Sequence, residues 1–164
     1  MSVLVAGIGN IFLGDDAFGS EVARRLLERS WPEDVRIVDF GIRGVDLTFA
    51  LLDDYDTVIL IDGTLRGGTP GTLYTIEPDL SELDEGVIEA HSMDPVTVLA
   101  AAKAMGARFQ RIYVVACEPD PATLDVEGAG SMGLSAAVAE AVERAVPIVE
   151  GLLARKAIGG TAHG

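Results

Sequence analysis

Short apolar runs alternate with amphipathic stretches along the chain of 164 residues. The runs carry few polar residues, which is typical of parallel strands covered on both faces. We expect these strands at 3–6, 35–38, 57–61 and 112–116. Apolar residues recur at helical spacing in between, and we expect the helices at 18–29, 45–52, from Asp94 to Met105, and at 134–155. Asp94 is expected to cap the third of these helices, and Met105 to lie on its inward face. The alternation predicts an α/β fold, a three-layer α/β/α sandwich with a mostly parallel, twisted sheet of about five strands.

One further strand differs from the others. The segment 72–76 alternates apolar and polar residues, and its connection to the preceding strand is too short for a helical crossover. We therefore expect an antiparallel edge strand. No linker or internal repeat interrupts the pattern, so residues 1–156 are expected to form a single domain, and 157–164 a disordered tail.

Charge and cysteine content exclude several classes of function. The chain has 12 Lys and Arg against 26 Asp and Glu, a formal net charge of −14. Such a surface repels phosphate backbones and anionic lipids, so neither nucleic acid nor a membrane is an expected partner. The single cysteine, Cys117, excludes an internal disulfide framework and a CxxC zinc site. With no long apolar segment and no basic leader, we expect a cytoplasmic protein.

Acidic residues cluster where the predicted strands end. They are Asp15 and Asp16 after the first strand, Asp39 after the second, Asp62 after the third and Glu118 after the last. Right-handed crossovers bring these strand ends to one edge of the sheet, and His91 precedes the helix that begins near Asp94. Two carboxylates and one imidazole suit a divalent ion such as Ni, Zn, Mn or Co, and leave coordination positions open for a guest.

Each of these residues also has a simpler interpretation. Asp15 or Asp16 can cap the first helix, Asp62 can belong to a plain turn at a strand end, and His91 can cap a helix or lie exposed. Cys117 fits a small apolar residue at the end of a strand better than a nucleophile. It is the combination of these residues at one edge that favours a metal site.

Two other chemistries find less support. Gly7 and Gly9 resemble the start of a dinucleotide-binding fingerprint, but Phe12 stands where that pattern needs its third glycine. The two following aspartates also oppose a bound pyrophosphate. A serine nucleophile is not indicated, because the sequence has no GxSxG elbow.

The segment from Gly7 to Gly19, GIGNIFLGDDAFG, closely resembles the N-terminal signature of the [NiFe]-hydrogenase maturation endopeptidases. Shorter matches follow in the same order, at Asp39-Phe40-Gly41, Ile61-Asp62, His91, Cys117-Glu118-Pro119 and Gly133-Leu134-Ser135. Together they extend from Val3 to about Leu153. Ala17 and Phe40 stand where many members of the family have glycine.

The resemblance implies a monomeric protease of the phosphorylase/hydrolase-like fold. Such enzymes remove a C-terminal extension from the precursor of the [NiFe]-hydrogenase large subunit after nickel has been inserted. Carried over residue by residue, the metal ligands are Asp16, Asp62 and His91, and Asp39 assists as a general base or as a partner of the ligands. Nickel is expected to arrive with the substrate, although other divalent ions can occupy the site. The alternatives are a non-catalytic nickel-binding or chaperone module for hydrogenase assembly and a nucleotide-binding, flavodoxin-like domain.

Overall fold

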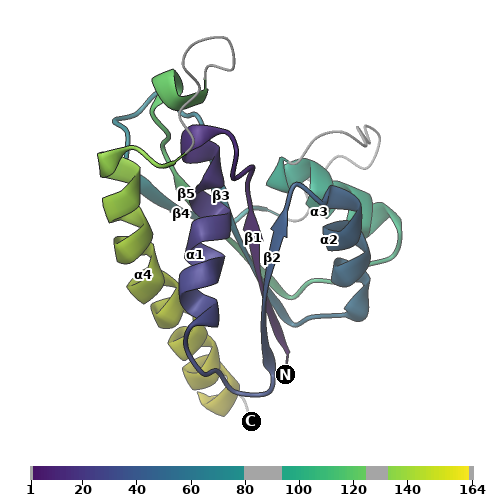
Figure 1. The fold of residues 1–164 in the computed structure, drawn as a ribbon. Coiled ribbons are helices and arrows are strands. Elements are labelled where there is room, and N and C mark those ends of the chain that lie inside the picture. The colour runs from purple at the N-terminus through teal and green to yellow at the C-terminus, as the bar shows by residue number, and fades with distance from the viewer. Residues whose placement is uncertain (1, 80–93, 125–132, 163–164) are drawn as a thin grey trace.

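The computed structural model describes residues 2–79, 94–124 and 133–162. Its strands form one sheet in the order β2-β1-β3-β5-β4 (Figure 1). The strands are β1 (Val3–Ile8), β2 (Val35–Gly41), β3 (Thr57–Gly63), β4 (Leu73–Ile76) and β5 (Arg111–Cys117). All neighbours are parallel except β4, which pairs antiparallel with β5 at one edge. The predicted sheet, including its antiparallel edge strand, is confirmed.

The strands of the parallel ladder extend further than their apolar runs. β3 continues through Asp62 and Gly63, because these residues remain in register with Ala116 and Cys117 of β5. β2 likewise continues to Gly41. The extent of backbone pairing determines where a strand ends, whereas the apolar pattern marks only the buried part of the strand. As a result Asp62 is held by the sheet itself.

Helices cover both faces of the sheet. The α-helices are α1 (Phe18–Leu27), α2 (Gly44–Ala50), α3 (Pro95–Ala104) and α4 (Ala136–Ala162), and the short 3-10 helices are η1 (Gly14–Ala17), η2 (Leu51–Asp53) and η4 (Pro121–Leu124). Figure 1 shows α1 and α4 on one face, and α2 and α3 on the other. Each face has its own apolar core. The three-layer sandwich is therefore confirmed within the described ranges.

The ends of two helices differ from the sequence-based expectation. Met105, expected on the inward face of α3, follows the last residue of that helix and is 52% exposed. The inward prediction was wrong, because the backbone leaves the helical path before Met105 can reach the core. Helix α4 continues to Ala162, beyond its expected end at Arg155. Glycine weakens a helix by about 1 kcal/mol but does not exclude it, and Gly159 and Gly160 lie within α4.

Two glycines bring helix α1 unusually close to the sheet. A Cβ atom on Gly19 would collide with the carbonyl oxygens of Ile8 and Ile61, and one on Gly7 would collide with the carbonyl oxygen of Gly19. The backbone of α1 therefore rests directly on the carboxyl ends of β1 and β3. This contact places η1, which precedes α1, beside the end of β3.

None of the helices in the described residues combines the length and the apolar character that crossing a bilayer requires.

Candidate active site

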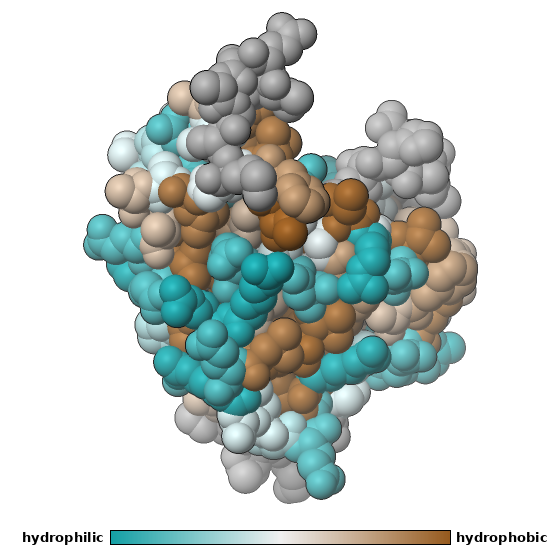
Figure 2. All heavy atoms as spheres, in the orientation of Figure 1, coloured by the Kyte–Doolittle hydropathy of each residue, from teal (hydrophilic) through white to brown (hydrophobic). Residues whose placement is uncertain are grey.

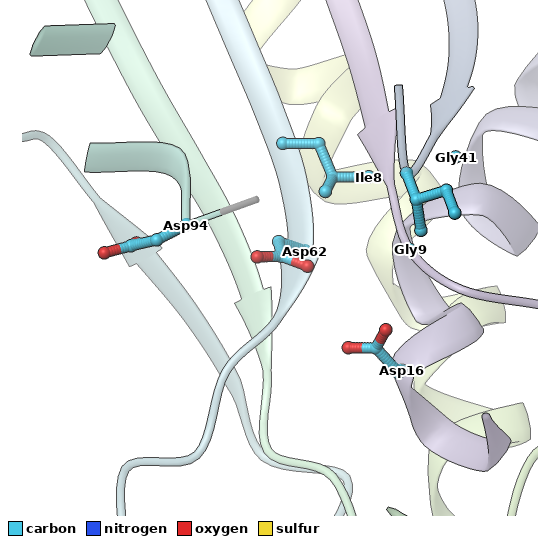
Figure 3. Close-up of a pocket in the computed structure, with 7 residues that line it drawn as sticks. Ile8, Gly9, Asp16, Gly41, Asp62 and Asp94 are labelled. Carbon is cyan, nitrogen blue, oxygen red and sulfur yellow. The ribbon is translucent and has the colours of Figure 1, made fainter. Parts of the chain in front are cut away.

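A pocket of about 200 Å³ opens at the carboxyl edge of the sheet (Figure 3). Its lining consists of Ile8, Gly9, Asp16, Gly41, Ile42, Asp62 and Asp94. Three of these residues are carboxylates, and the rest present backbone or aliphatic atoms. We call this space the carboxylate pocket.

Asp62 lies near the end of β3 and is only 8% exposed. Burial raises the pKa of its carboxyl well above the ordinary 3.8, and the negative charges of Asp16 and Asp94 raise it further. A backbone hydrogen bond from Gly63 opposes this shift in part. The folded protein thus holds a charged Asp62 at a cost, which a bound cation would relieve.

Asp16 comes from the 3-10 helix η1 on the opposite wall. Its Oδ2 accepts a hydrogen bond of 3.0 Å from the backbone N–H of Asn10. Burial raises the pKa of Asp16, and this hydrogen bond lowers it. In Figure 3 the carboxylates of Asp16 and Asp62 point into the same space between the ends of β1 and β3.

The donor set of the carboxylate pocket suits a divalent cation. Two converging carboxylates supply oxygen ligands and a negative potential, and a cation between them would relieve the repulsion between their like charges. Within the described part of the chain, no group of three or more His, Cys, Asp or Glu side chains could hold a metal ion. The third expected ligand, His91, lies outside the described residues. Asp16 and Asp62, the two expected ligands that the structure describes, are brought together.

Asp94 lines the same pocket but has a structural role at the start of α3. Its side chain accepts a hydrogen bond from the backbone N–H of Val96, which caps the helix as the sequence predicts. Figure 3 shows the side chain of Asp94 pointing away from Asp62. Its charge still contributes to the raised pKa of Asp62.

The structure places Asp39 beside the carboxylate pocket and not in its lining. Its Oδ1 accepts a hydrogen bond of 3.0 Å from the backbone N–H of Gly41, and its Oδ2 lies 3.8 Å from Nε of Arg24. Gly41 has a positive φ of 57° and is part of the pocket wall. In this structure Asp39 therefore shapes the wall of the pocket.

Asp15, the neighbour of Asp16, is fully buried and joins three segments of the chain. Its carboxylate accepts hydrogen bonds from the backbone N–H of Asp120 at 2.8 Å, and from the N–H and Oγ of Ser135 at 2.7 and 2.8 Å. Its own N–H donates to Oγ1 of Thr123. Residue spacing alone does not show this role, and the only signal in the sequence is the motif that contains Ser135.

Glu118, the acid that follows β5, is also a buried anchor. Its carboxylate accepts hydrogen bonds from the backbone N–H groups of Arg66 and Gly68 and from the hydroxyl of Tyr74. These bonds, with that from Arg66 first, lower the pKa of Glu118. The acids at the strand ends thus divide into pocket residues and anchors of the surrounding loops.

Cys117 is buried at the end of β5, as expected for a small apolar residue at a strand end. Burial, and then the charge of Asp15, raises the pKa of its thiol to about 12. The thiol is therefore protonated at neutral pH, and a neutral thiol is a poor nucleophile.

The molecule is thus an α/β domain with an acidic pocket at the carboxyl edge of a mainly parallel sheet, where ligands bind in such folds. Residues 20–152 match the family model of the hydrogenase maturation proteases. The chain belongs to the hydrogenase maturation protease family.

Individual relatives agree with this assignment. A protein of Methanocaldococcus jannaschii that bears the name hydrogenase maturation protease is 30% identical over 152 residues, which are 91% of this chain and 94% of the relative. The hydrogenase maturating endopeptidase HybD of Escherichia coli has a similar structure, with a TM-score of 0.77 and 25% identity over 95% of this chain and 94% of its own. A hydrogenase 2 maturation peptidase from a Thaumarchaeota archaeon has a TM-score of 0.72 and 31% identity, and the match covers 94% and 99% of the two chains. The expected family, fold and peptidase activity are confirmed.

Proposed function

We propose that this protein removes the C-terminal extension of the precursor of a [NiFe]-hydrogenase large subunit after nickel has been inserted. The observation that supports the proposal is the convergence of Asp16 and Asp62 in one pocket, in a chain that belongs to this protease family. Nickel is part of the substrate in this proposal. The precursor's thiolates hold the metal, and this protein offers the remaining ligands.

Asp16, Asp62 and His91 are the proposed ligands. Two carboxylates whose pKa values are raised by burial gain most from a cation, because the cation offsets the cost of keeping them charged. Binding the nickel anchors the precursor and positions one peptide bond at the pocket. The nickel supplies Lewis-acid polarisation there, at the carbonyl or at the attacking water. Hydrolysis adds one water across that bond and leaves a carboxylate and an amine.

In this proposal Asp39 assists the reaction by positioning the residues that surround the ligands. Its hydrogen bond to the N–H of Gly41 fixes a wall of the carboxylate pocket. Both metal-assisted and carboxylate-assisted attack are compatible with this arrangement. The protein acts as a monomer in the cytoplasm.

The test is intact mass spectrometry of purified precursor, nickel-loaded or nickel-free, after incubation with this protein. We expect only the nickel-loaded precursor to lose its C-terminal extension. Asp16→Asn, Asp62→Asn and His91→Ala should each slow this loss by about a hundredfold or more, because the peptide bond is no longer positioned. The control is Asp53→Asn, an exposed acid that precedes β3 and lies at the opposite end of that strand.

Other outcomes would contradict the proposal. A stable complex with the nickel-loaded precursor but no mass loss would indicate the non-catalytic nickel-binding or chaperone module. Equal cleavage of both precursor forms would contradict recognition through nickel. Native rates in the Asp62→Asn and His91→Ala variants would contradict the assigned ligands.

A further inference from the structure

A second hollow of about 340 Å³ adjoins the carboxylate pocket. The two share Gly9, Gly41 and Ile42 as walls. The remaining lining comes from the loop after β1, which includes Phe12, from the end of β2, which includes Phe40, and from α1 and Arg43. We call this second hollow the apolar groove.

Two large apolar side chains of the apolar groove are left in solvent. Phe12 is 68% exposed and Ile42 is 63% exposed. Figure 2 shows hydrophobic side chains at the surface over the upper ends of β1 and β2, the region where these loops lie. Exposed apolar side chains gathered at one hollow favour a partner that covers them.

The turn that bears Phe12 is fixed to the carboxylate pocket. The side chain of Asn10 accepts a hydrogen bond of 2.9 Å from the backbone N–H of Phe12. The N–H of Asn10 in turn donates to the carboxylate of Asp16. A change at the proposed metal ligand Asp16 therefore acts on the turn that presents Phe12.

The loop that bears Ile42 is fixed in the same way. The backbone N–H of Gly9 donates to the carbonyl oxygen of Gly41, and the N–H of Gly41 donates to Asp39. The backbone segments that carry both exposed side chains are thus fixed by hydrogen bonds. A preorganised contact surface loses little entropy on binding.

Arg43 limits how a ligand can use the apolar groove. Its guanidinium donates to the carbonyl oxygens of Asp39 and Phe40, near the end of the edge strand β2. A peptide that added a strand to β2 at this point would compete for those acceptors. Recognition through side chains is therefore favoured over recognition through backbone pairing.

Charge in the apolar groove is largely balanced. Arg24 lies beside Asp39, and Arg43 pairs with Asp46. Neither a strongly acidic nor a strongly basic ligand gains from such pairs, so an apolar segment fits best. Since the groove and the carboxylate pocket share walls, a chain anchored in the pocket has room to continue into the groove.

We propose that the apolar groove binds the stretch of precursor polypeptide next to the scissile bond, and that an apolar side chain of this stretch sits between Phe12 and Ile42. This inference rests on the proposed function. It assigns Phe12 and Ile42 as specificity-determining residues, which touch the substrate without taking part in the chemistry.

The first test separates binding from turnover. Phe12→Ser and Ile42→Ser should each raise KM for the nickel-loaded precursor by about tenfold. This is the effect of losing the burial of roughly half of a large apolar side chain on binding. The kcat at saturating precursor should change by less than about twofold, because the groove supplies binding and not chemistry. Leu27→Ser is the matched control, since Leu27 is 53% exposed at the far end of α1.

The second test needs no turnover. The photoreactive residue p-benzoylphenylalanine at position 12 should crosslink to the nickel-loaded precursor within a few residues of the bond that is cut, and the same residue at position 27 should not. Crosslinking to a second copy of this chain, or to a distant part of the precursor, would overturn the proposal. So would an unchanged KM in both serine variants.

The two proposals fail in different ways. If the wild-type protein does not shorten the precursor, the proposed function is wrong. If the wild-type protein shortens it and both serine variants have normal KM and kcat, only the assignment of the apolar groove is wrong.

Discussion

The side chain of Asp62 affects both the proposed function and the stability of the fold. It is buried beside two other acids, so the folded protein pays for its negative charge. Asp62→Asn removes that charge and keeps the shape. At pH 8 we expect the free energy of unfolding to rise on the order of 1 kcal/mol, because the neutral amide no longer carries the desolvation cost of a buried charge. Urea unfolding measures this change, and processing of nickel-loaded precursor should be lost in the same variant.

The pH dependence of this difference provides the control. The pKa of Asp62 is raised in the folded state, so its destabilising effect is present above that raised pKa and disappears as the pH falls through it. The advantage of Asp62→Asn should therefore shrink toward pH 4. An advantage that stays constant with pH would show that the gain does not come from the charge.

Asp15 has the opposite role, although it is adjacent to Asp16 in the sequence. Its carboxylate satisfies two backbone N–H groups and one hydroxyl in a fully buried position. Asp15→Ala leaves these donors without their acceptor, and we expect a loss on the order of 3 kcal/mol in urea unfolding. Ser135→Ala removes only the hydroxyl and should cost about 1 kcal/mol.

Hydrogen exchange locates the effect of Asp15→Ala. The amides of Asp120 and Ser135 should exchange faster in this variant, because both donate to Asp15 in the native protein. Uniformly faster exchange across the sheet, with no excess at these two amides, would contradict the anchoring role.

At the scale of elements, the close approach of α1 to the sheet decides whether the pocket forms. Gly19→Ala would press a methyl group against the carbonyl oxygens of Ile8 and Ile61. We expect a loss of about 3 kcal/mol or more in thermal or urea unfolding, since backbone atoms cannot move aside as a flexible side chain does. The displaced α1 would also carry Asp16 away from Asp62.

Gly151 in α4 is the matched control for Gly19. A Cβ atom at Gly151 meets no atom within 4 Å. Gly151→Ala should therefore stabilise the protein by up to about 1 kcal/mol through helix propensity alone. Equal effects of the two alanine substitutions would contradict the close packing of α1.

The elements that could be predicted from the sequence are those governed by local chemistry. The buried run at 57–61 indicates a central strand, and the short connection before 72–76 indicates an antiparallel edge strand; the structure contains both. The cap at Asp94 is equally local, and it is confirmed. Met105 was misplaced because the apolar pattern does not show where the backbone of α3 leaves the helix.

The candidate site could be predicted only in part. Asp16 and Asp62 converge because parallel strands end at one edge, a rule that applies without coordinates. The roles of Asp15 and Glu118 depend on hydrogen bonds to residues about 50 to more than 100 positions away in the chain, so residue types at the strand ends cannot separate pocket residues from anchors. The apolar groove was missed for the same reason, since Phe12 and Ile42 belong to different loops.

At the scale of the whole molecule, repulsion among the excess negative charges is the main electrostatic feature. The formal net charge is −14. Ion pairs on the surface, such as Arg25–Glu143 with both side chains about half exposed, contribute little. Lowering the pH from 8 removes part of the self-repulsion. Self-repulsion and the buried carboxylates therefore act in the same direction.

Stability and activity should respond to pH in opposite directions. The pKa values of Asp16 and Asp62 are raised above 3.8 in the folded state, so between that value and the raised values the folded protein binds more protons than the unfolded chain. The free energy of unfolding should therefore rise as the pH falls from 8 toward mildly acidic values. Below about 4.5 it should fall again, because the pKa of Glu118 is lowered and its stabilising charge is lost there.

Processing should decline over the same mildly acidic range, because protonated Asp16 and Asp62 cannot bind nickel. Urea unfolding and precursor processing, both measured from pH 8 to pH 4, test this divergence. High salt at pH 8 separates the two causes of the rise in stability, since it screens surface repulsion but leaves buried Asp62 charged. If stability and processing declined together from pH 8, the raised pKa values of the pocket would be wrong, and with them the reason why these two carboxylates favour an incoming cation.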